Sequence, residues 1–267
     1  MPICVAVIAV GLPSYSLWSS TFAPNLRRWC ARHGYALEVF TEPLDPSRTD
    51  RSISWQKLLL AGHPRLSGYD RIHYFDHDVL LSPIAPPLEV PDGKIGAVTW
   101  RGSYHGDPVF YEAMRETWKH NYMKWVMDAN IDSFARLAEV GGYPPHEDWM
   151  NAGVMSFQPR HADFFAEVYK EPDHERSSLE QQALTHWLCN RRADLLHPLD
   201  RRWNQVFDVL TVTHYAFLPL LYPKSFIVAK CVECALRNHF AVHFAGGGER
   251  EEARAYMEME HLREDAA

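Results

Sequence analysis

Ile3-Cys-Val-Ala-Val-Ile-Ala-Val10 is the stretch that decides the fold of this 267-residue chain. It is a continuous apolar run, and Gly11 and Pro13 follow it. A strand with one solvent-facing side alternates apolar and polar residues, whereas an unbroken apolar run is typical of a strand buried on both faces. Such strands belong to parallel sheets that helices cover on both sides. The run therefore predicts an α/β fold.

The segments that follow alternate between helical and extended patterns. Apolar residues at helical spacing predict a helix over residues 19–33, with Gly34 as its C-terminal cap. A short helix is expected over 55–61, and strands over 36–41, 70–75 and 94–100. This order implies βαβ units and a Rossmann-like, mostly parallel sheet flanked by helices. Ligands on such sheets bind beyond the carboxyl ends of the strands, which points to residues 11–16 and 76–78.

The composition disfavours several classes of protein. The net charge is −7 with both signs interspersed, whereas a nucleic-acid-binding protein normally carries a basic patch. Asp208, His214 and Pro219 interrupt the most apolar stretch, residues 207–222, so no transmembrane segment is expected. The first residues lack the basic region and cleavage site of a signal peptide. Five cysteines, an odd number, favour a reducing, cytoplasmic location.

Two aspartates follow the third predicted strand, in Ile72-His-Tyr-Phe-Asp76-His-Asp78-Val-Leu-Leu81. Side chains two residues apart on a strand share a face, so Asp76 and Asp78 should point together and His77 away. On an ideal strand they would be about 6 to 7 Å apart, and both can hold one ion only if the chain curls or a water intervenes. Carboxylate oxygens suit Mg²⁺ or Mn²⁺, which can bridge to a diphosphate. Alternatively, the two aspartates only satisfy a turn.

Four further segments join this aspartate pair in order along the chain: Asn151-Ala-Gly-Val-Met155, Glu180-Gln-Gln182, Leu199-Asp-Arg-Arg-Trp-Asn204 and Val242-His-Phe-Ala-Gly246. Together the five resemble the GT-A glycosyltransferases, especially the retaining family that includes glycogenin and the bacterial lipopolysaccharide galactosyltransferases. The aspartate pair is similar to the family's Asp-any-Asp metal motif, and the last segment to its His-any-any-Gly element. The resemblance covers residues 3–246. Each motif is short, so the specificity comes from the order of all five.

The resemblance implies a function and a set of site residues. It implies a metal-dependent transferase that moves a hexose from a nucleotide diphosphate sugar, with uridine as the nucleoside, and retains the anomeric configuration. The acceptor would be a saccharide, a lipid-linked molecule or a small molecule. The metal, Mn²⁺ or Mg²⁺, would be held by Asp76, Asp78 and His243. The implied donor-binding residues are Tyr15, Lys57, Asp76, Asn151, Ala152, Gly153, Gly246 and Arg250. The implied catalytic residues are Gln181 and Glu180.

On the same basis, residues 1–267 are expected to form a single GT-A-like domain. Its parts would be a nucleotide-binding half over 1–100, a half for the acceptor and the donor sugar over 148–250, and a C-terminal helix over 251–267. Between the halves, residues 101–147 are aromatic and rich in histidine, which predicts an insertion or lid. The polar residues there either line an acceptor pocket or are solvated: His105, Asp107, His120, His146, Glu147 and Asp148.

Simpler structural roles are open for several of these residues. His243 follows an apolar run and could be a histidine of the core. Lys57 could neutralise a phosphate or be a solvated lysine on a helix. Gln181 could lie on a helix surface, and Tyr15 could pack against the sheet instead of stacking on a base.

Two residues depart from the family's pattern. The family usually has a lysine after the late glycine to hold the diphosphate, but only Arg250 follows Gly246 here. An arginine is not equivalent, because its charge is spread over a planar fork. Glu180 replaces the commoner Asp, so its carboxylate reaches one carbon further.

Two other functions share part of the pattern. A haloacid dehalogenase-type phosphohydrolase also has Asp-any-Asp after an apolar strand, but its nucleophile normally follows the first strand, whereas Asp76 follows two βα units. A non-catalytic nucleotide-sugar-binding module would keep the ion site without turnover, and the missing lysine near Arg250 supports it. Phosphatase activity would identify the first, and product formation would exclude the second.

Overall fold

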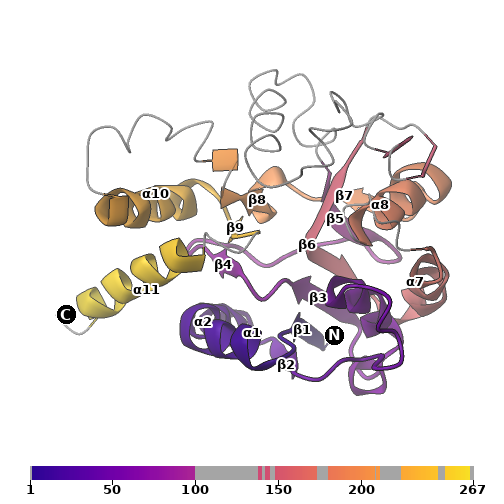
Figure 1. The fold of residues 1–267 in the computed structure, drawn as a ribbon, viewed down its shortest axis with the longest axis horizontal. Helices are drawn as coiled ribbons and strands as arrows, with labels where there is room; N and C mark the ends of the chain where they lie inside the picture. The colour runs from indigo at the N-terminus through magenta and orange to yellow at the C-terminus, as the bar shows by residue number, and fades with distance from the viewer. Residues whose placement is uncertain are drawn as a thin grey trace.

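The structure, a computed structural model, describes residues 2–99, 138–139, 142–144, 148–172, 180–207, 209–210, 224–245 and 250–264, which are coloured in Figure 1. Most of the predicted insertion, residues 101–147, lies outside the described residues. Within the described part the strands form two sheets, and helices pack around them.

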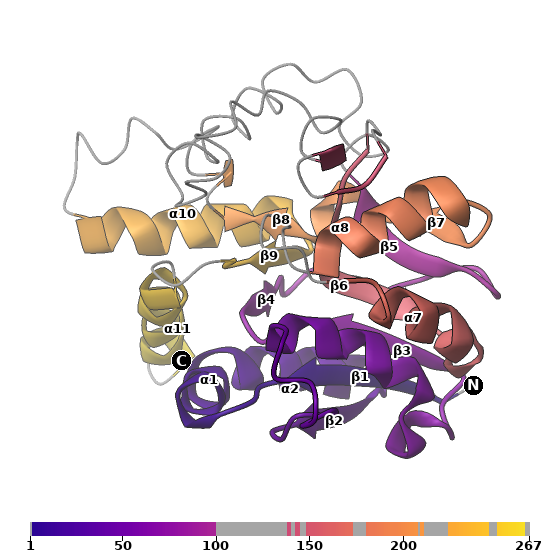
Figure 2. The same cartoon turned by 45° about the vertical axis from the view of Figure 1, so that its right-hand side comes forward.

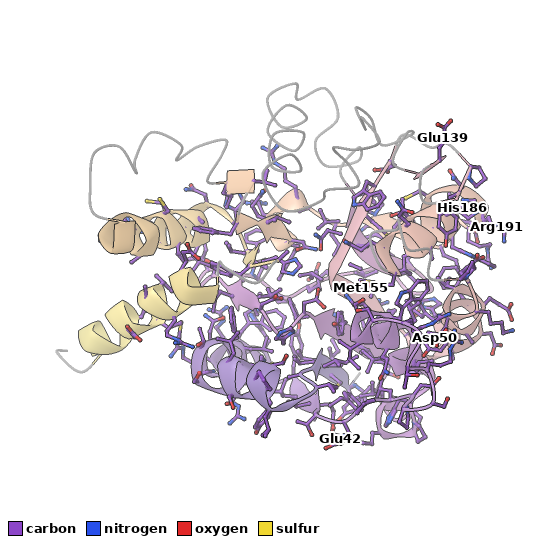
Figure 3. All side chains as sticks on the ribbon, in the orientation of Figure 1. Glu42, Asp50, Glu139, Met155, His186 and Arg191 are labelled. Atoms are coloured by element: carbon purple, nitrogen blue, oxygen red, sulfur yellow. The ribbon has the colours of Figure 1, made fainter. Side chains whose placement is uncertain are left out.

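Six strands form the main sheet, in the order β2-β1-β3-β6-β5-β7. Their bounds in that order are Ala36–Phe40, Ile3–Ile8, Arg71–Phe75, Met150–Phe157, Ile95–Thr99 and Leu196–Pro198. β1 pairs parallel with β2 and β3, β5 pairs parallel with β7, and β6 runs antiparallel to both of its neighbours. Met155 of β6 is fully buried near the middle of the molecule (Figure 3). The predicted mostly parallel sheet is therefore confirmed, with β6 as the reversed strand.

β1 is apolar throughout because it faces two hydrophobic cores. Val7 belongs to the core that includes α2 (Ala23–His33), whereas the adjacent Ala6 belongs to the core that includes η2 (Ile53–Gly62) and α7 (Ala162–Tyr169). Both residues are completely buried. Successive side chains of a strand point to opposite faces, so a sheet covered on both sides requires apolar residues at every position.

The first crossover helix is longer than the sequence predicted. It begins with α1 (Leu12–Leu17), continues through the π-helical turn η1 (Trp18–Phe22) and ends with α2, without a break. Gly11 and Pro13, which we expected only to end β1, also begin this helix. Gly11 is its N-cap, with a φ of 86°, and Pro13 lies in the first turn, where proline is tolerated. Gly34 ends the helix in the left-handed conformation, as predicted.

The other helices all follow η2 along the chain. The short ones are η3 (Pro64–Leu66), η4 (Pro159–His161), α8 (Glu180–Thr185), η5 (His186–Arg191) and η6 (Arg201–Trp203), and the long ones are α10 (Lys224–Asn238) and α11 (Arg250–Glu264). α10 and α11 pack together at one end of the molecule, and α7 and α8 lie at the other (Figure 2). No helix in the described part combines the length and the hydropathy that a membrane span requires.

A second sheet of three short strands lies beside the main one, in the order β4-β9-β8. β4 (Val79–Leu81) pairs antiparallel with β9 (Ala241–His243), and β9 pairs parallel with β8 (Gln205–Val206). In this register His243 lies opposite Val79, the residue that follows Asp78. The small sheet therefore carries His243 to the aspartate pair.

Candidate metal and ligand site

Asp76, His77 and Asp78 form the link between the two sheets. Asp76 follows β3, His77 and Asp78 form a turn, and β4 begins at the next residue. The backbone N–H of Asp76 donates to the carbonyl of Gly153 at 2.8 Å, and the carbonyl of Asp78 accepts from the N–H of Phe244 at 2.9 Å. The chain thus curls between the aspartates, as one shared ion requires. The spacing of an ideal strand therefore does not apply to Asp76 and Asp78. His77, which we predicted to face away, lines the same cavity as both aspartates because the turn breaks the strand alternation.

Asp76, Asp78 and His243 come together from distant parts of the sequence. One ligand atom of each lies within 4.8 Å of those of the other two. Nε2 of His243 is 3.3 Å from Oδ1 of Asp78 and 3.5 Å from Oδ2 of Asp76. Burial alone would lower the pKa of His243, but its hydrogen bond to Asp78 and the charges of both aspartates raise it above its ordinary value of 6.5. His243 is thus buried, but it faces two carboxylates rather than an apolar core.

The three ligand atoms fit a divalent cation. Two buried or half-buried carboxylates at this separation repel one another, and a cation between them would remove that repulsion. Carboxylate oxygens with one imidazole nitrogen suit Mn²⁺ and Mg²⁺. Three protein ligands leave positions of an octahedral shell for water or for a bound phosphate.

Lys57 is a buried cation between two carboxylates. Its side chain is 3% exposed, and Nζ lies 3.0 Å from Oδ1 of Asp76 and 2.8 Å from Oε1 of Glu180. Nζ also donates to the carbonyl of Ala152 at 3.4 Å. Burial alone would lower the pKa of Lys57, but the charges of Asp76 and Glu180 raise it above its ordinary value, so the ammonium stays charged. The alternative that Lys57 is a solvated lysine on a helix is therefore wrong, because η2 packs with the side chain of Lys57 turned into the protein.

Tyr74 fixes the same aspartate from within β3. Its hydroxyl donates to Oδ1 of Asp76, and Nζ of Lys57 lies 5.1 Å from the centre of its ring. Oδ1 of Asp76 is thus held by two donors, whereas Oδ2 faces His243. Tyr74 was not among the site residues predicted from the sequence. Its position two residues before Asp76, on the same face of the strand, was the available signal.

Glu180 and Gln181 begin α8 beside β6. Oε1 of Gln181 accepts from the N–H of Ala152 at 3.3 Å, so this residue is tied to the strand rather than lying on a free helix surface. Oε2 of Glu180 is buried and, among the described residues, has no hydrogen-bond partner. Glu180 and Gln181 both line the cavity. A buried acceptor without a partner is costly, so a ligand hydroxyl is a natural partner for this oxygen.

Asn151 and Gly153 connect β6 to the histidine. Oδ1 of Asn151 accepts from the N–H of Gly153 and from Nδ2 of Asn204, both at 2.8 Å. A Cβ at Gly153 would overlap the imidazole of His243, so only glycine fits there. Asn204 in turn contacts His243, since its Oδ1 lies 3.2 Å from Nδ1. Asn204 belongs to one of the motifs, yet we did not predict it as a site residue.

Most of these side chains line one cavity of about 250 Å³, but Ala152, Gly153 and Asn204 are not part of its lining. The walls come from the end of β1, from η2, from the turn after β3, from β6, from α8 and from β9. Of the two segments that the sequence indicated, residues 76–78 line the cavity and residues 11–16 do not. Ile8 and Ile53 supply apolar surface to a lining that is otherwise mostly polar or charged. The cavity is large enough for part of a nucleotide sugar rather than for an ion alone.

Several predicted residues lie elsewhere. Tyr15, on α1, is half-exposed, is not among the residues that line the cavity, and has its ring 6.0 Å from that of Trp18. Gly246 and the side chain of Arg250 lie outside the described residues. So do five polar residues of the insertion: His105, Asp107, His120, His146 and Glu147. Asp148 accepts the N–H of Trp149 at 2.8 Å and is absent from the cavity lining.

Comparison with known proteins shows a likeness in structure. No family model and no curated protein matches the sequence. A glycosyltransferase involved in the glycosylation of the major capsid of PBCV-1 superposes with a TM-score of 0.52 at 11% identity, over 96% of this chain and 99% of that one. The bifunctional glycosyltransferase WbbM gives a TM-score of 0.50 at 13% identity, over 92% of this chain and 46% of that one. This chain therefore spans just under half the length of WbbM.

The comparison confirms the fold predicted from the five motifs. The superposition on the first of these glycosyltransferases covers nearly the whole of both chains. The chain has the GT-A fold of glycosyltransferases.

Proposed function

We propose that the protein is a metal-dependent glycosyltransferase that moves a hexose from a nucleotide diphosphate sugar to an acceptor hydroxyl. The observation that supports it most is the cluster of Asp76, Asp78 and His243 in a cavity at the carboxyl edge of a GT-A sheet. We propose uridine as the nucleoside, because the motifs resemble those of galactosyl- and glucosyltransferases. The acceptor would be a saccharide, a lipid-linked molecule or a small molecule.

The charged residues of the cavity have proposed roles. Asp76, Asp78 and His243 would hold the cation, which would neutralise charge that develops on the departing diphosphate. Lys57 and Tyr74 both donate to Oδ1 of Asp76, whereas Oδ2 has a longer contact of 3.4 Å with Lys57 and faces His243, where it would bind the cation.

The donor sugar would lie against β6 and α8. Asn151, Ala152 and Gly153 would let the backbone approach it, while Glu180 and Gln181 would lie beside its reacting carbon. The free Oε2 of Glu180 can accept a hydrogen bond from a sugar hydroxyl.

Retention of configuration fits the charges in the cavity. Asp76 and Glu180 are both paired with Lys57, so the charge of each carboxylate already has a cation beside it. We propose that the acceptor attacks the face that the phosphate leaves and that the departing phosphate oxygen takes the proton, which balances the step without a side-chain base.

The competing functions are less well supported. In a phosphohydrolase one aspartate would attack phosphorus, but Oδ1 of Asp76 is held by Lys57 and Tyr74, and Asp76 follows β3 rather than β1. A binding module without turnover is favoured by one observation: the charge of Lys57 is already balanced by two carboxylates, so less of it is left for a diphosphate.

We also propose a cytoplasmic location. The support is that all five cysteines lie in the described part of the chain and none is in a disulfide.

A panel of nucleotide sugars tests the proposal. Thermal unfolding should shift upward with a nucleotide sugar and Mn²⁺ together, and less with either alone, because the metal and the diphosphate complete one site. Calorimetry should show tighter binding of UDP than of GDP or CDP. Preferred binding of GDP would overturn the uridine assignment. Binding of the donors without any release of nucleotide would favour the binding module.

A further inference from the structure

We infer that Asn204 is a positioning residue that supports the metal-binding form of His243 and sets the amide orientation of Asn151. The inference rests on the proposed metal site, and it assigns a role to a residue that touches neither the cavity nor the other two metal-binding residues. Asn204 is 2% exposed, directly follows η6 and is the last residue of the Leu199–Asn204 motif.

The orientation of both amides follows from one backbone group, the N–H of Gly153. The N–H of Gly153 can only donate, and it donates to Oδ1 of Asn151 at 2.8 Å. The oxygen of the Asn151 amide is therefore the atom that faces Gly153. Nδ2 of Asn204 lies 2.8 Å from the same oxygen and 3.0 Å from the backbone carbonyl of Asn151. Since both neighbours are acceptors, the NH₂ group of Asn204 must face them.

The orientation of Asn204 then decides the protonation of the histidine. With its NH₂ group on Asn151, the oxygen of Asn204 faces Nδ1 of His243 at 3.2 Å. An oxygen can only accept, so Nδ1 donates to it when a cation takes the place of a hydrogen on Nε2. In neutral imidazole the other nitrogen, Nε2, then has the lone pair. Nε2 is the atom that faces Asp76 and Asp78, so the network presents the ligand lone pair to the cation position.

The same network limits what Asn151 can offer a ligand. Its oxygen already accepts two hydrogen bonds, from Gly153 and Asn204. Among the described residues, no acceptor takes the hydrogens of its Nδ2, and Asn151 lines the cavity. Asn151 is therefore arranged as a donor, to a hydroxyl or phosphate oxygen. The buried side-chain amide of Asn204 thus positions both His243, a metal ligand, and Asn151, a donor to the bound molecule.

Two substitutions separate the two roles. Asn204→Asp keeps an oxygen that accepts from Nδ1 of His243 but loses the donor to Asn151. Asn204→Ala loses both. Asn238→Ala, which removes an exposed asparagine side chain bonded to the carbonyl of Cys234, is the matched control. Circular dichroism and thermal unfolding establish that each variant is folded.

Binding of Mn²⁺ without donor, followed by calorimetry or electron paramagnetic resonance, is the first measurement. We expect Asn204→Ala to weaken Mn²⁺ binding by roughly tenfold or more, as is typical when the hydrogen-bond partner of a ligating histidine is lost. Asn204→Asp should stay within a few-fold of the parent protein, and Asn238→Ala should be unchanged. Equal affinity in Asn204→Ala and the parent would overturn the inference, whereas no Mn²⁺ binding by the parent would refute the metal site of the proposed function.

Discussion

At the scale of single residues, the site depends on residues that do not bind the ligand themselves but position those that do. Gly153 shows this most clearly: its N–H fixes Asn151, its carbonyl accepts the N–H of Asp76, and its missing side chain leaves room for His243. Three segments distant in the sequence therefore meet at one backbone position. A substitution there should change the metal site without touching a metal ligand.

Gly153→Ala tests this. The added methyl overlaps the imidazole, so His243 must move, and we expect Mn²⁺ affinity to fall by about tenfold and stability by about 1–3 kcal/mol. Gly62→Ala is the control, because its Cβ would be in ordinary contact, 3.5 Å from that of Ala162. Mn²⁺ titrations and urea unfolding measure both effects. Unchanged Mn²⁺ binding by Gly153→Ala would show that His243 is not held where the structure has it.

Lys57 permits a second prediction, on stability. Lys57→Met removes the cation and leaves the carboxylates of Asp76 and Glu180 without it, which typically costs about 3–5 kcal/mol for a buried pair. Lys170→Met removes an exposed lysine that pairs with Glu167, and it should cost less than about 1 kcal/mol. Unfolding in urea without metal compares the two. Similar losses in both variants would mean that the buried pairing is weaker than its geometry indicates.

At the scale of elements, β3 carries two kinds of polar group on its two faces. Tyr74 and Asp76 face the cavity, whereas His73 is completely buried on the other face. Nδ1 of His73 lies 3.0 Å from Oγ of Ser156 on β6, and its ring is 5.4 Å from that of Tyr35. Burial, and secondarily the charge of Arg71, lower the pKa of His73 from 6.5 to about 3.

This histidine should make the protein less stable in mild acid. Below pH 6.5 the unfolded chain binds a proton at His73 that the folded protein does not bind until about pH 3. Between these values the free energy of unfolding should fall by up to about 1.4 kcal/mol per pH unit from this group alone. His73→Gln keeps a polar group near Ser156 but does not titrate, so its unfolding free energy should fall less steeply than that of the parent. Parallel pH profiles would contradict the assignment.

The elements also show what the sequence could and could not predict. The apolar run of β1, the cap at Gly34 and the aspartate pair are local patterns, so they could be predicted without the fold. The three strands that position His243 are two or three residues long, and so short a segment has no detectable period. The burial of Lys57 depends on the packing of η2 against the rest of the fold, which no local pattern contains.

At the scale of the whole molecule, two sheets and six segments of chain build one cavity. The main sheet supplies the turn after β3, and the small sheet brings β9 back from near the end of the chain. The order of the motifs predicted this fold, and the elements that carry the motifs follow one another along the chain in that order. The acceptor side could not be predicted equally well, because the insertion has no comparable motif.

The stereochemical outcome belongs to this scale, since it depends on how the donor and the acceptor meet. If the acceptor attacks the face that the phosphate leaves, an α-linked donor should give an α-linked first product. Water can replace the unknown acceptor, and proton NMR of the hexose first released from an α-linked uridine diphosphate hexose shows its anomeric coupling. A β product would refute retention and would require a side-chain base near the acceptor.

The most direct test of the account is the metal dependence of nucleotide release. UDP formed from UDP-glucose or UDP-galactose is measured with Mn²⁺, with a chelator, and after Mn²⁺ is restored, in the parent protein and in Asp78→Asn. The account predicts release that the chelator abolishes and Mn²⁺ restores. Asp78→Asn, which keeps the shape but removes a charge, should be slower by on the order of a hundredfold or more. Release that continues undiminished in chelator, or in Asp78→Asn, would contradict it.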